Sequence, residues 1–157
     1  MLLRLHDFLK EIQADEVPHS GRSLMNHLLG TYGILKKWDC EEFVCLAGGL
    51  HSIYGTNVFK RESLSIEARP RVRHLFGEDA ERLAWQFGTI NRPKAIEIGF
   101  GIDRRRNTEI ILKEPDLKSL RLIEAANLLE QGASLDSWPN ILKIATENTS
   151  KFHQSEI

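Results

Sequence analysis

The stretch that decides the fold is residues 23–52, SLMNHLLGTYGILKKWDCEEFVCLAGGLHS. Its first half has apolar residues at helical spacing, namely Leu24, Leu28, Ile34 and Leu35. This period of about 3.6 residues predicts an amphipathic helix over residues 23–38. Asp39 is the expected N-cap of the next helix, which runs to His51 and is apolar on nearly every side. Such a helix is expected in the centre of a domain.

Two glycines in the second helix indicate how the pair packs. Gly48 and Gly49 each cost about 1 kcal/mol in a helix interior relative to alanine. That cost is tolerated where another backbone must approach closely. We therefore expect the two helices to cross near these glycines.

The flanking sequence predicts further helices and one hairpin. Helical patterns cover residues 2–12, a short stretch between Pro70 and Gly77, residues 78–87, residues 115–132, and a last helix from Trp138. The segments KAIEIGFGI (94–102) and TEIILKE (108–114) alternate apolar and polar residues, which predicts a small β-hairpin. We interpret the arginines of its turn, residues 104–106, as solvated. The predicted fold class is mainly α, with residues from about 147 to 157 frayed.

Composition narrows the classes of function. The chain has 157 residues, 41% of them hydrophobic, which suits one domain. Its net charge of -1 supplies no general attraction to nucleic acid or to an anionic membrane. Its apolar stretches are shorter than the roughly 20 residues of a membrane span, and Asp7 and Glu11 interrupt the first helix where a signal peptide would be apolar. Cys40 and Cys45 form no disulfide framework. We expect a cytoplasmic protein that binds a small molecule, with a homodimer left open.

Histidines give the main chemical signal. Three of the six, His19, His27 and His51, lie in or beside the two central helices. A single buried histidine is usually a packed and hydrogen-bonded core residue. Two on facing helices, with a third in the preceding loop, instead indicate one polar pocket.

These residues resemble a known family. His27, followed by a histidine at the end of the apolar helix LAGGLHS (46–52), is similar to the HD-domain superfamily of metal-dependent phosphohydrolases, whose signature ends AALLHD. The segment RLIEAANLLEQ (121–131) resembles the helix that carries the last aspartate of that family, and Asn127 stands in its place. The segments HSGRSLMNHLLGTYGILKKW (19–38) and HSIYGTNVF (51–59) look like an uncharacterised branch of HD-like proteins.

The resemblance implies a metal site with altered ligands. HD hydrolases hold a divalent metal with His, His-Asp and a distal Asp, whereas Ser52 and Asn127 are neutral and bind hard cations weakly. The implied cofactor is a divalent transition metal, Zn²⁺, Fe²⁺, Ni²⁺ or Mn²⁺. The candidate ligands are His19, His27, His51, Glu124 and Asn127.

Three functions stay open at this point. The first is a metal-dependent hydrolase or oxygenase that acts on a small anionic substrate, for instance a phosphorylated one. The second is a metal-free enzyme or binding protein that uses His27 and His51 as acid and base. The third is a catalytically degenerate scaffold. We expect Tyr54 to assist catalysis, and Arg22, Thr56 and Ser52 to bind the substrate. Arg22 precedes a helix N-terminus, where an anion is favoured, although a solvated surface arginine explains it equally.

Overall fold

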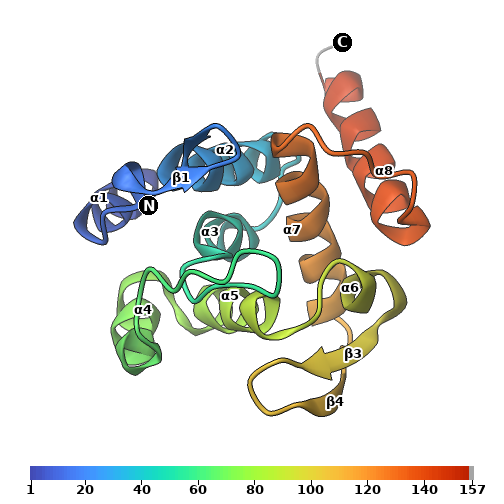
Figure 1. Ribbon diagram of the computed structural model, residues 1–157. Helices are drawn as coiled ribbons and strands as arrows, with labels where there is room; N and C mark the ends of the chain where they lie inside the picture. Colours follow the sequence, from blue (N-terminus) through green and yellow to red (C-terminus); the bar gives the residue numbers. More distant parts are fainter. Residues whose placement is uncertain (156–157) are drawn as a thin grey trace.

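The computed structural model describes residues 1–155, most of which form eight α-helices (Figure 1). The helices are α1 (Leu2–Glu11), α2 (Leu24–Lys37), α3 (Glu42–Leu50), α4 (Arg69–Phe76), α5 (Glu78–Thr89), α6 (Lys94–Ile98), α7 (Asp116–Glu130) and α8 (Pro139–Ser155). Two antiparallel hairpins join β1 (Pro18–His19) to β2 (Arg22–Ser23) and β3 (Phe100–Asp103) to β4 (Thr108–Ile111). The predicted mainly α fold is confirmed. None of the helices in the described range combines the length and hydrophobicity of a membrane span.

Helix α3 forms the centre of the fold and packs against α2, α5 and α7. It is buried from Val44 to Leu50. A Cβ atom on Gly48 would lie 2.3 Å from Leu35 of α2, so this glycine does permit a close crossing. A Cβ on Gly49 would lie 2.5 Å from Leu5, which shows that this glycine makes room for α1 rather than for α2.

The ends of the two central helices differ in part from the prediction. Ser23 caps α2, because its hydroxyl accepts the backbone N–H of Asn26 at 3.1 Å. Asp39 is not the N-cap of α3. It ends α2 in the left-handed conformation, with φ 56°, and Cys40 N–H donates across it to Leu35 O at 3.1 Å. The N-cap of α3 is Glu41.

Two further segments correct the sequence-based expectations. Residues 94–98 form the short helix α6 rather than a strand, since Pro93 precedes it and Gly99 ends it with φ 88°. The β-hairpin is therefore shorter than predicted. At the C-terminus, α8 continues to Ser155, so residues 147–155 are helical where fraying was expected, and residues 156–157 lie outside the described range.

The tip of the β3–β4 hairpin is hydrogen-bonded to α5 and to the loop that follows His51. Arg104 donates to Gly88 O and to Tyr54 O, the latter at 3.2 Å, and Arg105 donates to Tyr54 O at 2.8 Å. Both side chains are half-buried, so the prediction of a solvated turn was wrong for them. Arg106 is exposed, as expected. The hydrogen bonds to Tyr54 O hold the loop that follows His51 in place.

The β1–β2 hairpin was not predicted, since its strands have only two residues each. Ser20 and Gly21 both have positive φ, 49° and 80°, as a tight two-residue hairpin turn requires. The pairing sets His19 opposite Arg22, just before α2 begins. Both side chains are thereby placed beside the central helices.

Candidate functional site

Three polar atoms from three elements meet in the interior. We call this group, formed by His27 of α2, His51 after α3 and Asn127 of α7, the histidine seam. His27 Nε2 lies 3.3 Å from His51 Nε2 and 2.8 Å from Asn127 Oδ1. All three residues are buried. The structure thus brings together the two imidazoles that the sequence placed on facing helices.

The outer nitrogen of each ring is held by an acceptor. His51 Nδ1 donates to Gly48 O at 2.6 Å, and His27 Nδ1 donates to the Glu130 carboxylate. A carbonyl and a carboxylate only accept, so both Nδ1 atoms carry the hydrogen. In the neutral rings, both Nε2 lone pairs then point to the centre of the seam.

Asn127 is oriented by a buried ion pair. Arg92 donates from Nε to Glu124 Oε2 at 2.6 Å and from NH2 to Glu124 Oε1. Glu124 Oε1 also accepts from Asn127 Nδ2 at 3.2 Å, which turns the amide oxygen toward His27. Glu124 was expected as a metal ligand, but in this structure its carboxylate is engaged by Arg92 and Asn127.

The polar atoms of the seam can share a positive charge. His27 Nε2, 3.3 Å from His51 Nε2 and 2.8 Å from Asn127 Oδ1, is repelled by both unless a proton or a metal ion is shared. Two ligands about 2.1 Å from one metal, at angles of about 90° to 110°, are about 3.0 to 3.4 Å apart. The separation of the two nitrogens falls in this range, whereas the distance of 2.8 Å to Asn127 is that of an ordinary hydrogen bond. Among the described side chains, no group of three or more His, Cys, Asp or Glu has metal-binding geometry.

Burial favours the neutral form of His51 and of His19. Desolvation lowers the pKa of His51 well below its usual 6.5, and the positive charges that His27 and Arg92 can carry lower it further. Desolvation is also the main cause that lowers the pKa of His19, with smaller effects from His27 and Arg92. Both rings are therefore neutral near pH 7.

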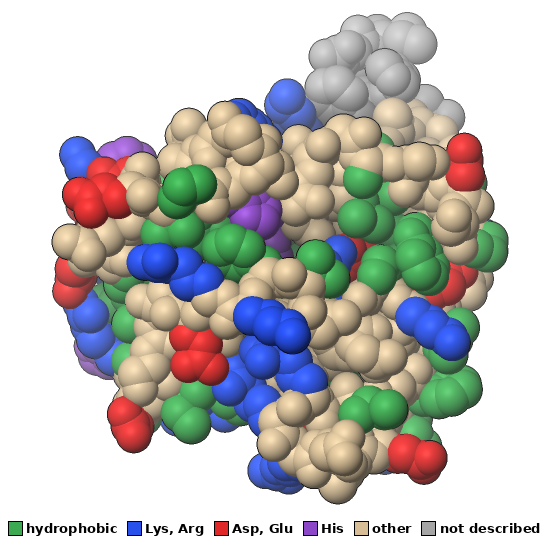
Figure 2. All heavy atoms as spheres, in the orientation of Figure 1, with side chains coloured by type: hydrophobic (Ala, Val, Ile, Leu, Met, Phe, Trp, Pro, Cys, Tyr) green, Lys and Arg blue, Asp and Glu red, His purple; other side chains and the backbone are tan. Residues whose placement is uncertain are grey.

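His19 covers the seam rather than joining it. Its ring lies 4.4 Å from the His27 ring, with Phe59 edge-on at 4.8 Å. His19 Nε2 accepts from Gln131 Nε2 at 3.1 Å, so this nitrogen is not directed to the shared centre. Figure 2 shows histidine atoms at the bottom of a hollow near the middle of this face. The predicted role of His19 as a metal ligand has no geometric support here.

Arg22 is committed to the protein. It donates to the Glu130 carboxylate and to Glu130 O at 3.3 Å, although its side chain is 45% exposed. A Cβ on Gly30 would lie 2.8 Å from Glu130 Oε1, so this glycine makes space for the carboxylate between Arg22 and His27. The expected free anion-binding group is instead part of the support of His27.

The three candidates that follow His51 have separate surroundings. Ser52 Oγ is buried and has no hydrogen-bond partner among the described residues. Tyr54 donates to Glu81 at 3.1 Å, and burial raises the pKa of its hydroxyl far above 10. Thr56 Oγ1 accepts two backbone N–H groups of its own turn, at 2.8 and 3.2 Å. Of these three, Ser52 alone lies next to the seam with an unused polar atom.

Sequence reasoning missed Glu130, Arg92 and Gln131. Helical spacing could have found two of them, because Glu130 and Gln131 lie three and four residues after Asn127 on the same helix face. No pattern marks Arg92, which stands in the connection between α5 and α6.

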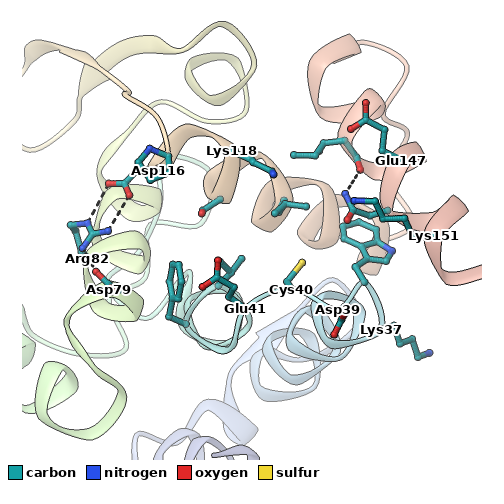
Figure 3. Close-up of a pocket in the computed structure, with 18 residues that line it drawn as sticks. Lys37, Asp39, Cys40, Glu41, Asp79, Arg82, Asp116, Lys118, Glu147 and Lys151 are labelled. Carbon is teal, nitrogen blue, oxygen red and sulfur yellow. Dashed lines mark hydrogen bonds and ion pairs between the residues drawn. The ribbon is translucent and has the colours of Figure 1, made fainter. Parts of the chain in front are cut away.

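A cavity lies elsewhere, between α8 and the starts of α3, α5 and α7 (Figure 3). It has a volume of about 840 Å³, and Trp38, Cys40 and Lys118 contribute to its lining. Arg82 in its wall is neutralised by Asp79 and Asp116. No residue of the histidine seam lines this cavity.

Comparison with known proteins identifies a family. Residues 8–92, more than half of the chain, match the family described as a domain of unknown function (DUF6817). The chain belongs to that family. No curated protein and no solved structure matches it.

Proposed function

We propose that this chain is a metal-dependent enzyme that resembles HD-domain hydrolases and acts on a small anionic substrate. The supporting observation is the histidine seam, in which His27 Nε2 lies 3.3 Å from His51 Nε2 and 2.8 Å from Asn127 Oδ1 while both outer nitrogens are fixed. Hydrogen bonds to the outer nitrogen of metal-binding histidines are the usual support of such ligands. Cys40 and Cys45 are free thiols, which favours a reducing compartment such as the cytoplasm.

The ligand set fits a transition metal better than Mg²⁺. His27 and His51 would hold the ion through Nε2 and Asn127 through its amide oxygen, with Ser52 Oγ as an unused neighbour in sequence. Imidazole ligands favour Zn²⁺, Fe²⁺ or Ni²⁺, whereas a set without carboxylates binds harder cations such as Mg²⁺ and Mn²⁺ more weakly.

A bound metal of this kind polarises a substrate oxygen and lowers the pKa of water. The protein contributes rigidity: Glu130 and Gly48 O hold the two imidazoles, and Glu124 holds Asn127. These three direct ligands are uncharged, so they leave the charge of the ion available to attract an anionic substrate. Hydrolysis of a phosphoester and oxidation both remain compatible with this arrangement.

Metal titration of chelator-treated protein tests the proposal. We expect saturable binding of one Zn²⁺, Fe²⁺, Ni²⁺ or Mn²⁺ per chain, measured by calorimetry and by elemental analysis. His51→Phe should weaken binding by about 100-fold or more, because it removes a direct ligand and keeps the ring volume. His74→Phe is the matched control, since His74 is an exposed histidine on α4. Wild-type protein that takes up less than about a tenth of an equivalent would overturn the proposal.

A second candidate function is acid–base catalysis without a metal. The two Nε2 atoms are within hydrogen-bond distance, so a proton on His27 can be shared with His51 while Glu130 stabilises the charged ring. This alternative predicts no metal uptake and loss of activity in His27→Gln. A scaffold role predicts neither metal uptake nor activity.

A further inference from the structure

Arg92 is a nearly buried cation with only part of its guanidinium in use. Its side chain is 8% exposed, and Nε and NH2 both donate to Glu124, which is fully buried. This paired geometry neutralises the charge of Glu124. It leaves the third nitrogen, NH1, to be accounted for.

NH1 donates to no residue in the range 1–155. It is also not one of the sealed, unpartnered polar atoms of the described residues, which means that it still reaches open space. NH1 therefore keeps some accessible surface on a side chain that is otherwise held rigidly. A donor of this kind, aimed by a buried ion pair, is suited to bind an acceptor from outside the protein.

The guanidinium group of Arg92 lies close to the histidine seam. The Arg92 guanidinium is 5.5 Å from the centre of the Phe87 ring, and that ring is 4.9 Å from the His51 ring. Asn57, in the loop after His51, donates to Arg92 O at 2.9 Å and keeps its own buried Oδ1 without a partner among described residues. Arg92 is thus tied to the seam from two sides.

Two other arginines near the seam also keep guanidinium nitrogens without partners among the described residues. Arg22 donates only from NH2, to Glu130, and its side chain is 45% exposed. Arg104 donates from Nε and NH2 to the carbonyl groups of Gly88 and Tyr54. Arg92 differs from both in being nearly buried and held by a buried carboxylate.

We propose that Arg92 is the residue that recognises the anionic part of the substrate, with NH1 donating to a phosphoryl or carboxylate oxygen bound beside His27 and His51. This rests on the proposed function for the location of the substrate, but the binding of the anion by Arg92 does not require the metal. Guanidinium donors suit both oxyanions.

Anion binding by metal-free protein tests this role. Inorganic pyrophosphate and oxalate are titrated separately by calorimetry, in excess chelator and at constant ionic strength, to distinguish phosphoryl from carboxylate recognition. Wild-type protein should bind at least one of the two in a saturable way. Arg92→Lys keeps a charge beside Glu124 but loses the outward NH1 donor, so we expect about tenfold weaker binding.

Two further variants separate recognition from folding. Arg92→Gln combined with Glu124→Gln removes both buried charges together, so it should stay folded by circular dichroism and bind the anion at least about tenfold more weakly. Arg82→Gln is the matched control, because Arg82 also donates from Nε and NH2 to a carboxylate of α7, that of Asp116, but lies at the distant cavity. It should bind within about threefold of wild type.

The proposal is overturned by any of three results. These are no saturable binding of either anion to wild type, binding within threefold of wild type in the double variant, or equal losses in Arg82→Gln and Arg92→Lys. Metal content is measured in parallel on protein without chelator. Binding that depends on Arg92 in a protein that takes up no metal would refute the proposed function and leave this inference standing.

Discussion

Helix α7 borders two regions with opposite properties. Its first turns line a cavity of about 840 Å³, whereas its last turns supply Asn127 and Glu130 to the histidine seam, whose residues do not line that cavity. In the cavity, Arg82 is matched by Asp79 and Asp116 (Figure 3). In the seam, lone pairs from three elements point at one another. The cavity and the aligned polar atoms therefore lie in different parts of this molecule. We take the alignment of polar atoms, rather than cavity volume, as the better guide to a reactive site.

Removing the charge of Glu130 should have the largest effect among changes to the side chains that support the seam. Glu130→Gln keeps the shape of the side chain but weakens its hold on His27, so we expect metal affinity to fall by about 10-fold to 100-fold. Glu147→Gln, which changes a carboxylate of the cavity, should leave metal affinity unchanged. Calorimetric titration of both variants checks the contrast, and similar losses in the two would contradict it.

Introducing an anionic ligand should sharpen the difference. Asn127→Asp places a carboxylate in the proposed ligand set, and we expect about tenfold tighter binding of Mn²⁺. The metal-free variant should be less stable, because the new carboxylate replaces an amide that donates to Glu124 at 3.2 Å. Asn148→Asp, in the lining of the cavity, is the control for added charge. Unchanged Mn²⁺ affinity in Asn127→Asp would argue against Asn127 as a ligand.

Cys40, in the lining of the cavity, should react slowly with thiol reagents. Burial raises the pKa of Cys40 to about 11, so very little thiolate exists at pH 8. Even with the greater nucleophilicity of a basic thiolate, alkylation of the folded protein should be about tenfold or more slower than that of a free thiol. The rate should rise with pH up to about 11, since a raised pKa delays ionisation. Iodoacetamide kinetics from pH 7 to pH 10 measure this, with denatured protein as the reference.

Two glycines of the central helices should respond in opposite directions. Gly48→Ala would drive a Cβ to 2.3 Å from Leu35 and should cost about 1 to 3 kcal/mol of unfolding free energy. Gly33→Ala meets nothing within 4 Å, so it should stabilise α2 by about 0.5 to 1 kcal/mol. Urea denaturation measures both values. A stabilised Gly48→Ala variant would show that the crossing at the seam is looser than described.

Local pattern was enough for the helices and for the pairing of two imidazoles. Periodic apolar residues place His27 and His51 on elements that must pack, and Gly48 marks where they cross. The sequence pattern gave a wrong prediction where one residue suits two different local structures. Asp39 suits either a helix start or the left-handed end of the preceding helix, and the position of α3 decides between them.

Tertiary placement decided the remaining errors. Tyr54 is three residues from His51 but donates to Glu81 on α5, because nearness in sequence does not set the direction of a side chain. A run of arginines in a turn looks solvated until a neighbouring loop offers carbonyl groups, as Gly88 and Tyr54 do for Arg104. Glu130 and Arg92 could be assigned only once α7 had a position relative to α2 and α5.

Some of the side chains that support the two imidazoles come from α7, which lies outside the segment that the family model matches. The family match ends at residue 92, so it includes both imidazoles and Arg92 but none of the α7 groups that orient them. A chain cut at that point would keep a buried guanidinium and two buried rings without their counterparts. Relatives that share this chemistry must therefore continue well past the matched segment and supply an equivalent helix.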